Sequence, residues 1–184
     1  MANQNTTTST KLVTGKARLS YANIWAPKAN EQGVEKYSVS IIIPKSDKAT
    51  VAKYNACIAA VKATGAAKWG GKVPPMLKTP LRDGDVERPD DEAYAGCYFM
   101  NANSNNKPGI VDANVNPILD QSEVYSGCYA RVSVNFFPYN NSGSKGIGCG
   151  LNNIQKIADG ESLGGVAPKA EDDFEAIETD GMLD

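Results

Sequence analysis

Side chains alternate in kind with a strict period of two between Cys128 and Tyr139. One parity is apolar and carries Cys128, Ala130, Val132, Val134 and Phe136. The other parity mixes rings, a guanidinium and small polar groups, in Tyr129, Arg131, Ser133, Asn135, Phe137 and Tyr139. A period of two is typical of a β-strand that is buried on one face only. The pattern therefore predicts a strand with a clean core face and an exposed face that is aromatic and basic.

The rest of the chain predicts a mainly β domain with one long helix and extended loops. Ser46 or Asp47 can cap a helix that runs to about Thr64. Residues 65–92 are rich in Gly, Pro and charge, so we expect a long irregular segment there, and residues 140–146 predict a flexible turn. Further strands are expected at residues 12–25, 36–43, 94–100 and 147–157.

Charge divides the chain into a basic body and an acidic end, although the net charge is only −2. Residues 1–157 hold 18 Lys and Arg against 12 Asp and Glu, whereas residues 158–184 hold 1 against 9. This asymmetry favours a polyanion-binding domain with a charge-mimicking extension, and the alternative is a solvated face with a disordered end. We expect a disordered lead-in at residues 1–10, a folded domain at 11–157 and a flexible acidic tail at 158–184.

Several classes of protein are disfavoured by the residues that the chain lacks. It has no His, which removes Ser-His-Asp systems, Cys-His nucleophiles and zinc sites built with imidazole. The four cysteines are far apart and form no CxxC pair, so we expect buried free thiols. No secretion signal and no membrane span are evident, so a cytoplasmic protein without cofactor, metal or membrane partner is expected.

The exposed strand face has the chemistry that single-stranded nucleic acid needs. Rings stack on bases whatever the sequence, while Arg and Lys follow the phosphates. The alternative is that a helix or loop covers Tyr129 and Phe137, and that each Trp packs in the core. The candidate DNA-binding residues are Lys16, Arg18, Trp25, Lys28, Lys36, Lys68, Trp69, Lys72, Arg82, Arg88, Tyr129, Arg131, Asn135, Phe137 and Tyr139. The candidate partner-binding residues of the tail are Asp172, Asp173, Phe174 and Glu175.

Acidic residues between Asp83 and Glu92 raise the question of a metal-dependent nuclease. A two-metal site needs carboxylates that converge from separate elements, and these all lie in one Pro- and Gly-rich stretch. A surface loop is therefore favoured, and metal-dependent cleavage lost on substitution of Asp83 or Asp85 would revive the enzyme hypothesis.

Long motifs in order resemble the single-stranded DNA-binding proteins of tailed phages. They include TGKARLSYANIW, EKYSVSIIIPKSD, KWGGKVPP, AYAGCYFMNANSNNKPG and SGCYARVSVNFFPYNNSGSKGIGCGLNNIQK, and they cover residues 11 to 175. The resemblance implies that the body is a single OB-fold, a five-stranded Greek-key barrel. It also implies an acidic tail that recruits replication partners or competes with DNA for the groove. Phe174 lies ten residues before the end of the chain, which leaves the role of the tip open.

The sequence thus predicts a sequence-tolerant binder of single-stranded DNA that catalyses nothing itself. The resemblance places it in phage DNA replication, repair or recombination, in the host cytoplasm. The alternative is a non-enzymatic, all-β phage structural or assembly protein that uses its acidic tail as a handle. Preference for DNA over RNA, self-association on DNA and the partners of the tail are left open.

Overall fold

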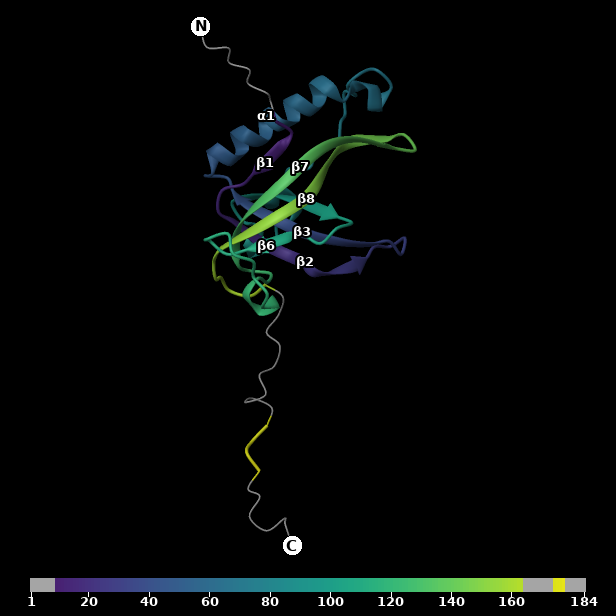
Figure 1. Cartoon of the computed structure of the whole chain (residues 1–184). Helices are drawn as coiled ribbons and strands as arrows, with labels where there is room; N and C mark the ends of the chain where they lie inside the picture. The colour runs from purple at the N-terminus through teal and green to yellow at the C-terminus, as the bar shows by residue number, and fades with distance from the viewer. Residues whose placement is uncertain (1–8, 164–173, 178–184) are drawn as a thin grey trace.

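The computed structural model describes residues 9–163 and 174–177, and strands dominate it (Figure 1). The expected residues 1–8 of the lead-in, together with Asp172 and Asp173, lie outside the described residues. The strands are β1 (Lys11–Val13), β2 (Ala17–Ala29), β3 (Glu35–Pro44), β4 (Arg82–Asp83), β5 (Cys97–Ser104), β6 (Gly109–Val111), β7 (Tyr129–Asn141) and β8 (Ser144–Ala158). The α-helices are α1 (Lys48–Thr64) and α2 (Gly84–Glu87), and the 3₁₀ helices are η1 (Ala66–Trp69), η2 (Glu92–Tyr94) and η3 (Gln121–Glu123).

Five of these strands close a barrel in OB-fold order. Neighbours run β2–β3–β5–β8–β7, and β7 pairs again with β2, where Ala17 lies opposite Ala130. The pairing of β5 with β8 is parallel and is made at Asn103 and Gly150. A five-stranded barrel of this connectivity is the OB-fold, so the expected fold class is confirmed. The short strands β1, β4 and β6 add to the edges of β7, β5 and β8.

The barrel is filled by the inward parity of its strands, because alternate side chains point to opposite faces. Leu19, Ile41, Met100, Val132 and Ile154 are all buried in one cluster. This confirms the core face predicted from the alternation in β7.

Helix α1 lies across one end of the barrel and presents its apolar side to β7 (Figure 1). The Asp47 carboxylate accepts hydrogen bonds from the Thr50 backbone N–H at 3.2 Å and from the Thr50 hydroxyl at 2.6 Å, so Asp47 is the cap. The rings of Tyr54 and Phe136 meet edge to face with their centroids 5.4 Å apart. The expected helix is therefore confirmed, and it seals the barrel end.

The turn between β7 and β8 is tighter than its composition suggested. The two strands pair out to Asn141 and Ser144, which leaves only Ser142 and Gly143 in the loop. Both turn residues have positive φ, at 50° and 93°. Two left-handed residues in succession give the type I′ geometry whose twist matches that of the strands. A turn is thus present within residues 140–146 as expected, but it is confined to two residues, and the hairpin extends to its tip.

Part of the irregular segment fills the space between β8 and β5. Lys78 forms an isolated parallel bridge with Gly146, and its carbonyl accepts the Ile147 N–H at 2.8 Å. The chain then continues into β4, which pairs with β5 at Phe99. The barrel wall is completed by this segment where β5 and β8 share only one pair.

Residues 158–163 lie against the barrel, although composition assigned them to the tail. The Lys156 ammonium and the Asp159 carboxylate are 2.6 Å apart, the Tyr125 hydroxyl donates to the Gly160 carbonyl at 2.8 Å, and the Leu163 N–H donates to Ser126 at 2.9 Å. The packed chain therefore continues at least to Leu163.

Among the described residues, no helix has the length and apolarity that a membrane crossing requires.

Candidate nucleic-acid interface

An open cleft of about 880 Å³ lies between β5 and the β7–β8 hairpin. The segment 78–83 forms one side, Asn101 and Asn103 of β5 lie opposite, and residues 147–149 with Tyr139 complete the lining. On the outward face of the barrel, Asn101 pairs in register with Ser40 and Asn103 with Ser38. The cleft therefore borders the outer surface of β3 and β5, the second and third strands of the barrel, at the Asn103 and Ser38 pair, whereas Ser40 is buried beneath Tyr94.

Two rings of β7 lie across glycines of β8 beside this cleft. Phe137 is opposite Gly148 and Tyr139 is opposite Gly146. A Cβ added to Gly148 would lie 2.5 Å from Cζ of Phe137, and one added to Gly146 would lie 2.5 Å from the Tyr139 hydroxyl oxygen. The rings can take these positions only because the facing positions have no side chain. Phe137 keeps 42% of its surface exposed, so neither helix nor loop covers it.

Cations and amides surround the two rings. Lys78 and Arg82 line the cleft, the former with its ammonium 3.2 Å from the Ser144 hydroxyl and the latter 3.8 Å from the Glu87 carboxylate. Arg82 was anticipated from the sequence, whereas Lys78, Asn101 and Asn103 were not. The outward parity of a strand through residues 97–104 could have indicated the two amides.

The β2–β3 hairpin projects in the same direction as the β7–β8 hairpin (Figure 1). Lys28 and Lys36 are cross-strand partners near its tip, so two of the predicted cations stand side by side. The Trp25 ring is half-buried, its N–H donates to the Val124 carbonyl at 2.9 Å, and the Lys107 ammonium lies 5.0 Å from the ring centroid. Lys107 was missed, because it comes from the distant loop between β5 and β6.

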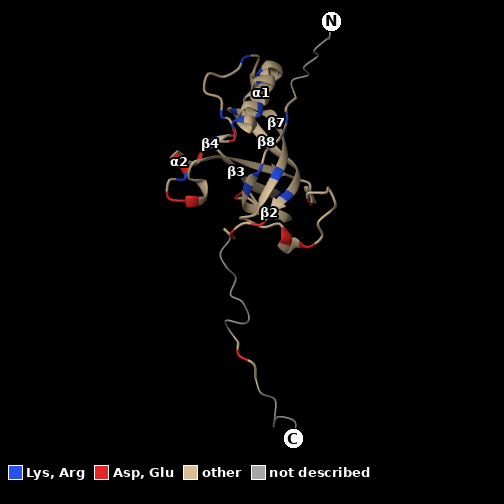
Figure 2. Ribbon diagram, turned by 90° about the vertical axis from the view of Figure 1, so that its left-hand side faces the viewer, with Lys and Arg blue, Asp and Glu red and all other residues tan. Residues whose placement is uncertain are grey.

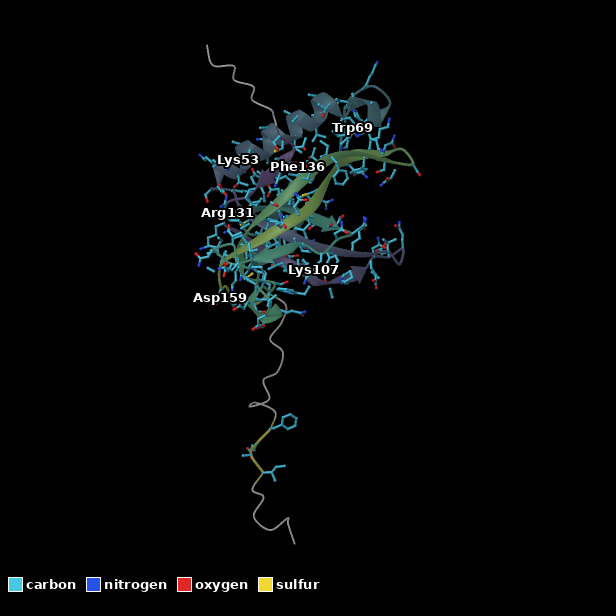
Figure 3. All side chains as sticks on the ribbon, in the orientation of Figure 1. Lys53, Trp69, Lys107, Arg131, Phe136 and Asp159 are labelled. Atoms are coloured by element: carbon cyan, nitrogen blue, oxygen red, sulfur yellow. The ribbon has the colours of Figure 1, made fainter. Side chains whose placement is uncertain are left out.

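Trp69 is not a base-contacting residue, and this expectation is corrected. Only 2% of its surface is exposed, and its indole N–H donates to the carbonyls of Tyr139 at 3.1 Å and Gly146 at 3.2 Å. Figure 3 places it between the end of α1 and the β7–β8 hairpin. A large apolar ring with a satisfied donor is most stable when buried there. Its neighbours Lys68 and Lys72 are exposed beside the hairpin.

Arg88 also lies away from the cleft. Its guanidinium carbon is 5.4 Å from the ring centroid of Tyr21, 5.2 Å from that of Tyr94 and 5.4 Å from that of Phe99. A half-buried guanidinium among three rings fastens residues 84–96 onto the outer face of β3 and β5. The structure therefore gives Arg88 a packing position outside the cleft lining, and phosphate contact by Arg88 stays a prediction.

Four predicted residues gather at the other end of β7, outside the cleft. The Lys16 ammonium is 4.7 Å and the Arg18 guanidinium carbon 5.7 Å from the Tyr129 ring centroid, and Arg131 is exposed on the same strand face. Asn135 lies midway along β7 and accepts a hydrogen bond from the Thr10 hydroxyl at 3.1 Å. The structure thus divides the predicted face between two ends of one long strand.

The acidic stretch is engaged with a lysine. The Lys45 ammonium is 2.8 Å from carboxylate oxygens of both Asp83 and Asp85. These hydrogen bonds raise the pKa of Lys45 and lower that of Asp85. Within the described part of the chain, no three His, Cys, Asp or Glu side chains converge on a metal position. All four cysteines are free, and burial raises the pKa of Cys149 to about 12.

The sequence matches the family described as the ssDNA-binding protein of Enterobacter phage Enc34 over residues 10–183. The chain belongs to this family. A relative from Acyrthosiphon pisum secondary endosymbiont phage 1, named putative protein p50, is 32% identical over an alignment of 187 positions that covers 94% of this chain and 98% of that protein.

Two solved structures share the fold of this family member. The single-stranded DNA-binding protein of bacteriophage Enc34 in complex with ssDNA superposes with a TM-score of 0.72 at 24% identity, over 84% of this chain and 89% of that one. The single-stranded DNA-binding protein gp2.5 of bacteriophage T7 superposes with a TM-score of 0.59 at 14% identity, over 86% of this chain and 97% of that one. Both likenesses concern the barrel fold.

Proposed function

We propose that this phage protein binds single-stranded DNA in the cleft between β5 and the β7–β8 hairpin. The observation that carries the proposal is the pair of rings held on glycines of β8: Tyr139 lines the cleft, and Phe137 lies opposite Gly148, which also lines it. OB-folds bind oligonucleotides on the face of their second and third strands and on the adjoining loops. The cleft borders that face, and the family is one of ssDNA-binding proteins.

Binding combines two kinds of contact. A base stacked on Phe137 contributes about 1–3 kcal/mol whatever its identity, since every base has a π-face. Lys28, Lys36 and Lys78 neutralise phosphates, so this part of the affinity falls with salt at about −0.7 in log–log slope per contact. A surface of rings and lysines does not read base edges, which makes the binding tolerant of sequence.

The broader role is coating single strands during phage DNA replication, repair or recombination, in the host cytoplasm. The chain acts as a binder rather than an enzyme: it has no His, and Asp83 and Asp85 are occupied by Lys45. The acidic tail competes with DNA for the cleft or recruits partner proteins. Phe174 and Glu175 are exposed in the described part of this tail, consistent with access to a partner.

The decisive experiment is an anisotropy titration of a labelled oligo-dT with the full chain at several salt concentrations. Phe137→Ala should weaken binding by the stacking energy of about 1–3 kcal/mol, roughly five- to hundredfold, and the loss should persist at high salt. Lys53→Ala is the control, since Lys53 is exposed on α1 on the far side of the hairpin (Figure 3). Absence of binding by the wild-type chain at low salt, or unchanged binding by the Phe137 variant, would contradict the proposal.

Two companion measurements address the tail and the enzyme alternative. A chain that ends after Leu163 should bind oligo-dT more tightly if the tail competes for the cleft, and with unchanged affinity if it serves only partners. The labelled oligonucleotide should remain intact with Mg²⁺ or Mn²⁺, and cleavage lost on Asp83→Asn would establish the nuclease instead.

A further inference from the structure

A second basic and aromatic surface lies at the start of β7, remote from the cleft. It consists of Lys16, which directly precedes β2, and Arg18 from the start of β2, with Tyr129 and Arg131 from β7, and we call it the basic end. Figure 2 shows blue segments on this side of the barrel, and Figure 3 places Arg131 at the left of the barrel, away from the hairpins that project to the right. We propose that the basic end is a second contact region for the same DNA strand, reached along the outer face of β7 and β8. This inference rests on the proposed function.

The cations of the basic end have no ion-pair partner among the residues that the structure describes. Arg18 donates from Nε to the Gly127 carbonyl at 3.1 Å and from Nη2 to the Glu161 carbonyl at 2.7 Å. Arg131 donates from Nε to the Thr14 carbonyl at 3.2 Å. Carbonyls orient a guanidinium without neutralising it. Among the described residues, neither arginine nor Lys16 forms an ion pair, so the described part of the chain supplies no anion to these three cations.

The ring between these cations repeats the composition of the cleft. Lys16 and Arg18 both lie over Tyr129, which is half-buried and therefore fixed in place. A ring with neighbouring cations suits a base and its phosphates, because one supplies a stacking surface and the others neutralise charge. An isolated phosphate would not use the ring. The surface thus favours a polynucleotide over a small anion.

The outer face of β7 connects the cleft to the basic end without an acidic residue. Between Phe137 and Arg131 the outward positions are Asn135 and Ser133. Their partners on β8 are Gly150 and Asn153, and Gln155 lies opposite Arg131. All these residues are neutral and small or polar, so the strip carries no charge that repels phosphate.

One further cation stands beside the middle of the strip. Lys11 of β1 is exposed and lies opposite Asn135. From Phe137 to Tyr129 the strip spans eight residue-to-residue steps of β7, about 26 Å at roughly 3.3 Å per step. OB-fold sites span about 4–16 nucleotides. A short oligonucleotide can therefore fill the cleft alone, whereas a long one can also reach the basic end.

The test uses oligonucleotide length to separate the two regions. The full chain is titrated with oligo-dT of about 6 and about 20 nucleotides, lengths chosen within and beyond the usual OB-fold range. Lys16→Ala with Arg131→Ala should leave the short oligonucleotide unaffected and reduce the salt slope for the long one by about 1.4, for two lost contacts. Lys48→Ala with Lys62→Ala is the charge-matched control, since both lysines are exposed on α1.

Each outcome decides the inference. If the wild-type chain binds the short oligonucleotide but the variant keeps the full slope for the long one, the second region is refuted and the cleft stands. If the variant weakens both lengths equally, the basic end is no separate region and the inference is also refuted. If neither length binds the wild-type chain, the proposed function fails as well.

Three further measurements separate loss of DNA contact from other effects of the substitutions. Thermal unfolding of the variant should match that of the wild type, because both substituted side chains are exposed. Tyr129→Leu should weaken the long oligonucleotide alone and the loss should persist at high salt, as stacking requires. A synthetic peptide of residues 171–184 tests the other polyanion: if the variant loses binding of this peptide but not of long DNA, the region serves the tail and the inference is overturned.

Discussion

The two hairpins that project from the barrel are built in opposite ways. The β7–β8 hairpin keeps its register from Val134 to the tip, and only the two turn residues are unpaired there. It is braced by Trp69, whose N–H bonds to carbonyls of both strands. The β2–β3 hairpin has two register shifts, between Ser20 and Asn23 and between Asn23 and Lys28, and its tip is exposed throughout.

In the proposed complex with DNA, the two hairpins make different contacts, and each contact has its own structural requirement. Stacking on Phe137 needs a ring at a fixed position, because its energy depends on close contact between two flat surfaces. Phosphate neutralisation by Lys28 and Lys36 tolerates movement, because the Coulomb interaction falls off slowly with distance. The braced hairpin therefore carries the rings, and the unbraced one carries a pair of lysines.

Removing the brace should have the largest effect. Trp69→Ala deletes a buried ring and leaves two carbonyls without their donor, which should lower the free energy of unfolding by about 3–5 kcal/mol. Urea denaturation measures this loss. The matched variant is Trp25→Ala at the base of the other hairpin, where the ring is only half-buried, and a smaller loss is expected. An equal or larger loss for Trp25 would break the contrast between the hairpins.

Filling the glycine surface should come next. Gly148→Ala places a methyl group where the Phe137 ring lies, so the ring must leave its position. The affinity for oligo-dT should fall by up to the stacking energy of about 1–3 kcal/mol. A double-mutant cycle supplies the control: in a Phe137→Ala background the same glycine substitution should cost nothing more. Additive losses would show that Gly148 acts by a different route.

Neutralising the lysine pair should have a smaller, salt-dependent effect. Lys28→Ala with Lys36→Ala should reduce the salt slope of binding by about 1.4 and have little effect at high salt. Anisotropy titrations at several salt concentrations measure the slope. The charge-matched pair Lys48→Ala and Lys62→Ala on α1 should leave it unchanged. A loss of equal size at every salt concentration would mean that these lysines position the hairpin instead.

The smallest effect should come from the ion pair that fastens segment 82–87 beside the cleft. The pKa of Asp85 is lowered in the folded protein, mainly by the Lys45 ammonium. Its stabilising contribution is therefore complete above the ordinary Asp value near 4 and is lost as the pH falls through the lowered value. Thermal unfolding from pH 6 down to pH 2 should show a shallower acid decline for Asp85→Asn than for the wild type. The exposed control Glu31→Gln should retain the wild-type decline. An unchanged decline for the Asp85 variant would show that the ion pair between Lys45 and Asp85 does not stabilise the folded protein.

Local pattern was sufficient for several features of the site. The alternation in β7 correctly predicted that Phe137 faces outward and Phe136 inward, because parity along a strand is a property of the backbone. Asp47 was correctly named as one of two possible caps of α1. The glycines at 146, 148 and 150 also alternate in the printed sequence, but that repeat has meaning only beside the rings of β7.

Local pattern failed where burial depends on distant partners. Trp25 and Trp69 both occur near lysines, yet one ring is half-exposed and the other is enclosed by residues more than 65 positions further along. Arg88 lies in a charged stretch that resembles a surface loop, and its guanidinium packs among three rings instead. Neither outcome can be derived from neighbours in the sequence.

Periodicity and composition were sufficient to predict the strand-rich class, the single long helix, the basic and acidic division of charge, and the face of β7 that carries the rings. These properties depend on residues close together in the chain. Which cations and rings share a surface depends on the closed barrel, because closure joins strands that are far apart in the chain. The closed barrel places the cleft and the basic end at different ends of β7, and it buries Trp69 against the β7–β8 hairpin.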